Sequence, residues 1–193
     1  MPKINLDKKT DEELADLSLK NPDIYLFLMQ RYENKLLHYI QNMSLVSLED
    51  AQDILQESFV KAYRNLNDFD SDLKFSSWIF RNVRNETINH FRRFKNKPQF
   101  KTSLKSDDLL NLVADENDPA KLLESKNKIK EINQILDHLD QKYREVLVLK
   151  YLEGKNYIEI SDILKKSPST VGTLIHRAKK IFKNKIKELK INL

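Results

Sequence analysis

Residues 156–180 read NYIEISDILKKSPSTVGTLIHRAKK. A short amphipathic segment ends near Leu164, and a second segment begins at Ser167-Pro168, where serine suits an N-cap and proline the first helical position. Two short helices joined by a tight turn, the second one rich in basic residues, are typical of a helix-turn-helix. The segment therefore predicts a helical DNA-binding unit in the C-terminal part of the chain.

The composition of the whole chain favours an all-α protein. Its 193 residues include 2 glycines and no cysteine. Two glycines are too few for the turns of a β-sandwich or for a glycine-rich phosphate loop, and the lack of cysteine excludes disulfides, thiolate zinc sites and a cysteine nucleophile. The apolar runs are far shorter than the ~20 residues of a membrane helix, and residues 1–17 lack the apolar core of a signal peptide. We therefore expect a cytoplasmic protein without membrane insertion.

Helical periodicity divides the chain into two units. Thr10-Asp11-Glu12-Glu13 fits a capping box, and Leu14 and Leu17 follow at helical spacing. Apolar residues recur at helical spacing in the following stretches: 22–43, 47–66 and 76–94, and again 129–139, 141–152, 156–164 and 168–189. The expected buried faces include Tyr25, Leu28, Tyr32, Leu36, Tyr39 and Met43 in 22–43, Leu48 and Tyr63 in 47–66, Phe91 in 76–94 and Ile158 in 156–164. Residues 67–74 are rich in Asp and Asn and predict a loop, and residues 95–118 break the pattern, with one helical turn expected around 109–113. We predict two small helical domains joined by a flexible linker, with these bounds: an N-terminal domain 1–96, the linker 97–120 and a helix-turn-helix domain 121–193.

The net charge of +5 is distributed unevenly along the chain. Residues 81–101 carry a net charge of +6 and residues 165–193 a net charge of +8, whereas residues 102–125 carry −4. Two basic patches with an acidic segment between them are the pattern expected of a chain that contacts a polyanion twice. The alternative is two basic helix faces that are simply solvated.

Two stretches of the first half carry a further pattern: DAQDILQESFVKAYRNL at 50–66 and FSSWIFRNVRNETINHFRR at 75–93. In the first, Asp53, Gln56 and Glu57 fall within one helical turn and share a face. An acidic face of this kind, taken alone, is more often solvated than functional. In the second, Trp78 lies on the apolar stripe, so we predict a core residue rather than a stacking platform.

Together with YREVLVLKYLEGKNYIEISDIL at 143–164 and STVGTLIHRAKK at 169–180, these stretches resemble bacterial sigma factors of the extracytoplasmic-function group of the sigma-70 family. The resemblance extends from about residue 21 to residue 189, with four motifs in the order and spacing of the family. It implies a transcription initiation factor that binds core RNA polymerase, directs it to specific promoters and assists promoter melting. It also implies a protein that is not an enzyme and that needs no metal or cofactor.

The resemblance assigns three sets of contacts by position. Core polymerase would be bound by Asp53, Gln56 and Glu57. The minus-ten promoter element, first as a duplex and then as the melted non-template strand, would be bound by Asn67, Asp68, Phe69, Lys74, Phe75, Arg81, Arg84, Asn85, Asn89, Arg92, Arg93 and Lys95. The minus-thirty-five element would be bound by Ser169, Thr170, Gly172, Thr173, His176, Arg177, Lys179 and Lys180.

The sequence departs from the family pattern at three positions. Asn89 stands where the family often has Asp, and Gly172 and Leu174 stand where its recognition helix often has basic residues. Glycine inside a helix costs about 1 kcal/mol relative to alanine, so either the helix tolerates Gly172 or another backbone comes close to it. An anti-sigma factor is a further partner that the resemblance allows.

Three other classes of protein serve as alternatives. A stand-alone helix-turn-helix repressor would bind a palindrome by itself, without polymerase. A helical adaptor would leave the basic C-terminal segment without a purpose. An enzyme is disfavoured because the four histidines, His38, His90, His138 and His176, show no ligand-type spacing and no nucleophile–base group stands out.

Overall fold

The computed structural model describes residues 5–44, 46–94 and 135–188, and these residues form helices and turns without a strand. The expected all-α class is confirmed. The elements of the first half are η1 (Leu6–Lys8), α1 (Asp11–Ser18), α2 (Pro22–Ser44), α3 (Leu48–Arg64), η2 (Leu66–Asp68) and α4 (Phe75–Phe94). Those of the second half are α7 (Gln141–Leu147), η3 (Val148–Leu152), α8 (Tyr157–Leu164) and α9 (Pro168–Glu188). The predicted linker, the helical turn at 109–113 and Lys95 lie outside the described residues.

Side-chain caps fix where the first helices begin. The Thr10 hydroxyl accepts a hydrogen bond from the Glu13 amide at 3.2 Å, and the Glu13 carboxylate accepts one from the Thr10 amide at 2.9 Å. The Ser47 hydroxyl accepts a bond from the Asp50 amide at the start of α3. Because each cap satisfies amides that a helix start leaves free, α1 and α3 begin where the sequence predicts.

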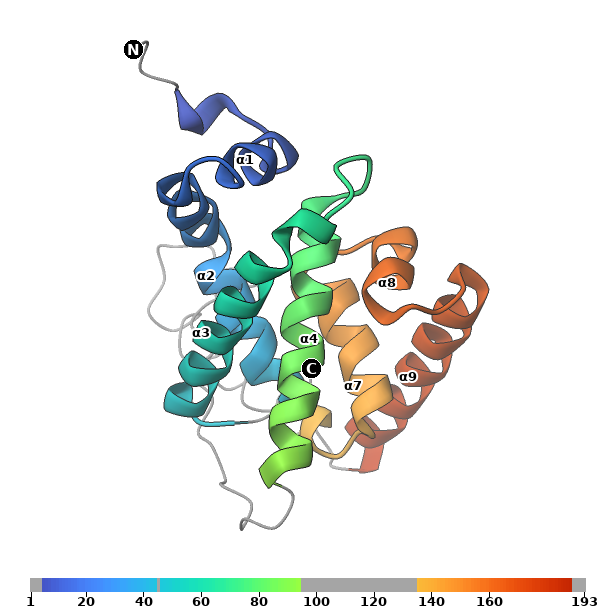
Figure 1. Ribbon diagram of the computed structural model, residues 1–193. Coiled ribbons are helices and arrows are strands. Elements are labelled where there is room, and N and C mark those ends of the chain that lie inside the picture. Colours follow the sequence, from blue (N-terminus) through green and yellow to red (C-terminus); the bar gives the residue numbers. More distant parts are fainter. Residues whose placement is uncertain (1–4, 45, 95–134, 189–193) are drawn as a thin grey trace, which may run out of the picture.

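The buried face of α2 forms the centre of the N-terminal half. The face predicted from the sequence is buried at every position: Tyr25, Leu28, Tyr32, Leu36, Tyr39 and Met43. α1 packs against α2, which also contacts α3, and α3 and α4 lie side by side (Figure 1). Apolar burial of this kind is the main favourable term that holds the four helices together.

The predicted apolar faces are wrong near the ends of the helices. We expected Leu48, Tyr63, Phe91 and Ile158 on buried faces, but they are 45%, 39%, 36% and 68% exposed. Each lies within the first or last turn of its helix, where the apolar face continues but none of the described helices covers it.

The C-terminal half contains the predicted helix-turn-helix. At the start of α8 the Asn156 side chain accepts a hydrogen bond from the Glu159 amide at 2.9 Å, and the Glu159 carboxylate accepts one from the Asn156 amide at 2.8 Å. Lys165 then adopts a left-handed conformation with φ of 52°, which ends α8, and α9 follows from Pro168. The expected single helix over 141–152 instead changes to π-helical pairing at Val148.

The two halves share one apolar core, although they are separated by 40 residues of sequence. α8 packs on α4, α7 and η3 contact α2, and Figure 1 shows α3 on one side of α4 and α8 on the other, with α9 outermost. The halves therefore form a closed arrangement. The predicted division into domains 1–96 and 121–193 stays a prediction, because its boundaries fall on residues that the structure does not describe.

Candidate nucleic-acid interface

α3 presents an acidic face to solvent. Its opposite side packs into the core through Ala51, Ile54, Leu55, Ser58 and Ala62. This packing leaves the three acidic-motif positions, Asp53, Gln56 and Glu57, exposed as the sequence predicts. Val60, 52% exposed, lies one turn after Gln56 and Glu57 and extends the same face. Val60 carries no signal in the sequence that would place it on this face, because exposure of an apolar residue depends on tertiary packing.

Ion pairs join α3 to α4. The Lys61 ammonium lies 2.5 Å from a carboxylate oxygen of Glu86, whose side chain is 5% exposed. Burial would raise the pKa of Glu86, but the hydrogen bond and charge of Lys61 outweigh it, and the pKa is lowered. The Arg93 guanidinium lies 3.7 Å from the Glu57 carboxylate and 3.8 Å from that of Glu86. The acidic face of α3 and the basic end of α4 are therefore connected.

Aromatic side chains anchor the segment that precedes α4. Phe69 is half-buried, with its ring centroid 5.3 Å from that of Phe75 and 5.5 Å from that of Trp78. Phe75 is fully buried and Trp78 is 8% exposed, so the prediction that Trp78 is a core residue is confirmed. Phe75, which the resemblance assigns to the minus-ten element, packs on the core side of this segment and does not face solvent.

The predicted loop 67–74 is shorter and more ordered than expected. It begins inside the 3-10 turn η2, and a second turn closes through a bond from the Leu73 amide to the Asp70 carbonyl at 3.0 Å. Asn67, Asp68 and Lys74 have exposed side chains on this segment. These turns hold polar groups at the start of α4, next to the aromatic anchor.

One face of α4 is polar and basic. Asn85, Asn89 and Arg92 are exposed and Arg81 is partly exposed, at a spacing that places all four on one side of the helix. Arg84 is not part of this face. It points into the C-terminal half, where its guanidinium donates bonds of 2.6 and 3.2 Å to the two oxygens of Glu145.

The first turns of α9 present small polar groups. Val171, Ile175 and Ala178 are buried, which leaves the predicted contact positions Ser169, Thr170, Thr173, His176, Arg177, Lys179 and Lys180 exposed. The Ser167 hydroxyl accepts a bond from the Thr170 amide at 3.3 Å and lies 2.8 Å from the Thr170 hydroxyl. Hydroxyls and basic groups on the N-terminal half of such a helix suit contacts to base edges and phosphates.

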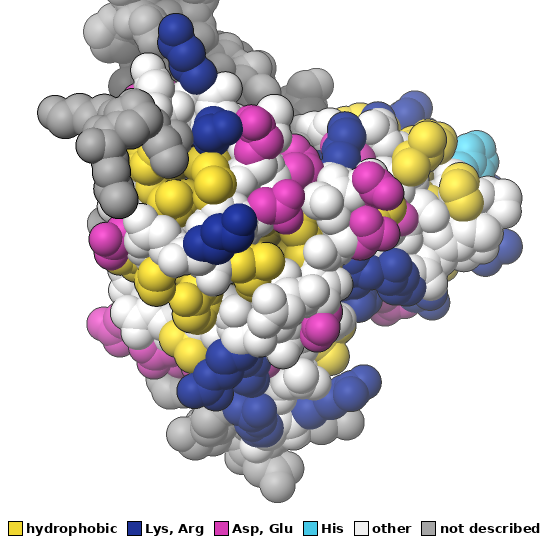
Figure 2. Space-filling model, turned by 45° about the horizontal axis from the view of Figure 1, so that its top comes forward, with side chains coloured by type: hydrophobic (Ala, Val, Ile, Leu, Met, Phe, Trp, Pro, Cys, Tyr) yellow, Lys and Arg dark blue, Asp and Glu magenta, His cyan; other side chains and the backbone are white. Residues whose placement is uncertain are grey.

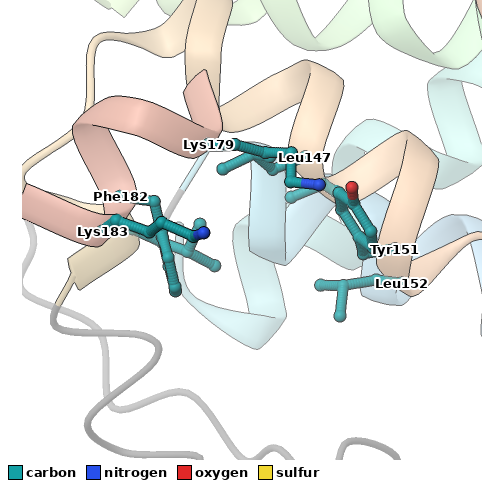
Figure 3. Close-up of a pocket in the computed structure, with 8 residues that line it drawn as sticks. Leu147, Tyr151, Leu152, Lys179, Phe182 and Lys183 are labelled. Carbon is teal, nitrogen blue, oxygen red and sulfur yellow. The ribbon is translucent and has the colours of Figure 1, made fainter. Parts of the chain in front are cut away.

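Lys179 lies at the edge of this surface. Its ammonium is 5.9 Å from the centroid of the Tyr151 ring, and its stem lines an apolar hollow of about 260 Å³ between η3 and α9 (Figure 3). The other lining residues are Leu136, Leu147, Val148, Tyr151, Leu152, Phe182 and Lys183. The hollow lies on the η3 side of α9, so Lys179 is placed less directly for DNA than Arg177.

Charged groups of both signs are visible on the face shown in Figure 2. Lys and Arg side chains gather near the lower edge. Elsewhere on this face, Asp and Glu side chains lie among further Lys and Arg side chains. Among the described residues no group of His, Asp and Glu has the arrangement of a metal site. No helix within the described ranges has the length and apolarity needed to cross a membrane.

Both halves match known protein regions. The family described as Sigma-70 region 2 matches residues 28–97, and Sigma-70, region 4 matches residues 129–181. The ECF RNA polymerase sigma factor SigW of Bacillus subtilis (strain 168) is 32% identical over 171 residues, which cover 86% of this chain and 91% of SigW. The chain belongs to the extracytoplasmic-function group of the sigma-70 family. This sigma factor is also 30% identical over 175 residues to RNA polymerase sigma factor NccH of Alcaligenes xylosoxydans xylosoxydans, covering 90% of this chain and 92% of NccH.

Solved structures show the same fold. CnrH, in complex with the cytosolic domain of CnrY, superposes with a TM-score of 0.70 at 23% identity and covers 93% of this sigma factor and 99% of CnrH. The sigma factor RpoE of Bartonella quintana, in complex with the anti-sigma factor NepR, gives a TM-score of 0.64 at 16% identity, covering 86% and 96% of the two chains.

The structure answers the question raised by Gly172. A Cβ added there would have Tyr157 Cε2 at 3.9 Å as its nearest neighbour, which is ordinary van der Waals contact. We predict that Gly172→Ala raises the free energy of unfolding by up to about 1 kcal/mol, because alanine is the better helix former. Urea unfolding followed by circular dichroism measures the change.

Gly154→Ala is the matched control. Gly154 has a φ of +63° in open space, so the same substitution there should lower the free energy of unfolding by about 1 kcal/mol. A loss of stability in Gly172→Ala would contradict the placement of this residue in an unobstructed helix.

Proposed function

We propose that this sigma factor docks on core RNA polymerase through the exposed face of α3. The observation that supports it is that Asp53, Gln56 and Glu57 share one solvent-facing side of a helix whose other side is fixed in the core. This helix presents carboxylates, an amide and the apolar side chain of Val60. A basic surface on the partner would meet both opposite charge and apolar contact area there. We infer that Val60 belongs to this docking face.

We propose two promoter contacts, one in each half. The minus-ten element would lie along the polar face of α4, formed by Arg81, Asn85, Asn89 and Arg92, and against the segment around Asn67, Asp68 and Phe69. A base extruded from the melted strand needs a pocket beside polar groups, and the anchored turns before α4 offer such a place. The minus-thirty-five element would receive the first turns of α9 in its major groove.

Each promoter contact alone would have a modest affinity, because it involves few bases and phosphates. Polymerase would hold both halves on one promoter, and the first contact would raise the effective concentration of the second. Promoter recognition therefore belongs to the holoenzyme, in which the factor directs initiation without catalysing a reaction itself. This work would take place in the cytoplasm, with core polymerase and promoter DNA as partners.

An anti-sigma factor is a further partner that we propose. RpoE was solved in complex with an anti-sigma factor and CnrH in complex with the cytosolic domain of another protein, and both share the fold of this chain. The chain has no cysteine, so a thiol switch within it is excluded and a protein regulator is the simpler route to control.

The docking proposal predicts that Asp53→Arg with Glu57→Arg weakens binding to core polymerase at least about tenfold, because two attractions become repulsions. Fluorescence anisotropy of the labelled factor, titrated with core polymerase, measures the dissociation constant. Asp16→Arg with Glu33→Arg is the matched control, since both carboxylates are exposed and lie on α1 and α2.

If the two double variants bind core polymerase with equal affinity, α3 is not the docking face. A wild-type chain that does not bind core polymerase but binds a palindromic duplex tightly would identify a repressor instead.

The minus-thirty-five proposal predicts that Arg177→Ala weakens holoenzyme binding to a promoter carrying both elements. The slope of log affinity against log salt should become shallower by about 1, because one phosphate contact is lost. Filter binding at several salt concentrations measures the slope. Lys20→Ala removes an exposed charge between α1 and α2 and should leave it unchanged.

A further inference from the structure

The first amide of α4 is bound by a side chain from another helix. Lys74 precedes α4, and its carbonyl accepts the hydrogen bond of the Trp78 amide at 3.2 Å. The lysine ammonium only donates, so it cannot serve a free amide of the helix start as serine or aspartate would. The Phe75 amide donates instead to the Glu12 carboxylate of α1, at 2.9 Å. A residue 63 positions earlier in the chain therefore caps α4.

This hydrogen bond is shielded from water. Phe75 is fully buried and Glu12 is half-buried. A buried amide without an acceptor is strongly unfavourable, because it has lost its water and gained no partner. The carboxylate also lies at the N-terminal end of α4, where the helix dipole favours a negative charge. Glu12 therefore stabilises a helix that begins at Phe75 and in this position.

Two side chains of α2 hold the first turn of α1 in place. The Arg31 guanidinium donates to one Asp11 oxygen at 2.8 Å and to the Leu6 carbonyl, also at 2.8 Å. The Tyr32 hydroxyl donates to the other Asp11 oxygen. Glu12 follows Asp11 directly, so these contacts fix where its carboxylate meets α4.

The aromatic group before α4 belongs to the same set of contacts. The ring centroids of Tyr32 and Phe75 are 5.6 Å apart, with the ring planes at 68°. Phe75 in turn contacts the rings of Phe69 and Trp78. α1 also contacts α4 directly, and Figure 1 shows α1 at the end of the molecule where α4 begins. The segment around Phe69 therefore rests on a residue whose amide is held by Glu12.

Three consecutive carboxylates open α1, and each has a different partner. Asp11 binds α2, Glu13 closes the capping box of α1 itself and Glu12 binds α4. The capping box thus leaves the Glu12 side chain free for the neighbouring helix. α1 also precedes residues 28–97, the part of the chain that matches region 2. The contact of Glu12 with α4 therefore joins a helix outside that region to the helix proposed to read the minus-ten element.

We propose that Glu12 is a positioning residue for minus-ten recognition. By holding the Phe75 amide, it sets where α4 begins and how the turns that carry Asn67 and Asp68 are presented to DNA. Glu12 does not bind DNA itself, because a carboxylate repels phosphate. This inference rests on the proposed minus-ten contact for its purpose. The cap itself is a property of the free chain, and it can be measured without polymerase.

Hydrogen exchange of the Phe75 amide measures the cap directly. In NMR spectra of the free chain, Glu12→Ala should speed exchange at Phe75 at least about tenfold relative to Val83 in the middle of α4, because the acceptor is lost. Glu12→Gln should keep the wild-type ratio, since its side-chain carbonyl can accept the same bond. Asp16→Ala, exposed one turn later on α1, is the matched control and should also keep it. An unchanged ratio in Glu12→Ala would overturn the cap.

Promoter discrimination tests the purpose of the cap. The probe is a duplex with a promoter recovered from factor-dependent transcripts, whose minus-ten or minus-thirty-five block is replaced in turn. Glu12→Ala should lower the preference of the holoenzyme for the intact minus-ten block at least about fivefold and leave its preference for the minus-thirty-five block unchanged. Glu12→Gln should restore the minus-ten preference. A general loss of stability would change the amount of active holoenzyme and neither preference, so unchanged preferences in Glu12→Ala would overturn the positioning role.

A second variant guards against misfolding of Glu12→Ala. Glu12→Asp keeps the charge and shortens the side chain by one methylene, which draws the carboxylate away from the Phe75 amide. It should speed exchange at Phe75 and lower the minus-ten preference in the same direction, and no change in either would contradict the proposal. A wild-type holoenzyme without preference for either block would refute the proposed function, whereas exchange at Phe75 would still decide the cap.

Discussion

The carboxylate of Glu145 accepts hydrogen bonds from two residues that lie 61 and 106 positions earlier in the chain. Around it the apolar core runs without interruption from α2 and α4 into α7 and α8. Because a buried carboxylate tolerates few geometries, this one interaction fixes the register in which the C-terminal half meets the N-terminal half. The positions of α8 and α9 relative to α4 follow from that register.

A second connection operates within the N-terminal half. Lys61 and the buried Glu86 join α3 to α4, and Arg93 reaches the exposed Glu57 carboxylate. Under the proposed function, the helix that docks on polymerase and the helix that reads the minus-ten element are thus one rigid unit. A basic polymerase surface would compete with Arg93 for Glu57 and leave Arg93 available for phosphate.

Local sequence signals predicted the helices and the faces, and tertiary contacts set their limits. The Thr10 capping box, the buried face of α2 and the exposure of Asp53, Gln56 and Glu57 follow from spacing that neighbouring residues satisfy by themselves. The placement of Arg84 could not be predicted, because a charge in α4 that is solvated in the isolated helix finds its partner in α7. The predicted burial of Leu48, Phe91 and Ile158 was wrong for a related reason, since helical periodicity does not show where a neighbouring helix ends.

Whether this chain confers promoter choice on core RNA polymerase can be measured by transcription from a library of random DNA fragments. Core polymerase would transcribe the library with and without the factor, and the transcript starts would be sequenced. We expect starts that depend on the factor and share two conserved blocks at fixed distances upstream, one for each half of the chain. Starts that are the same with and without the factor, or that share a single block, would contradict this expectation.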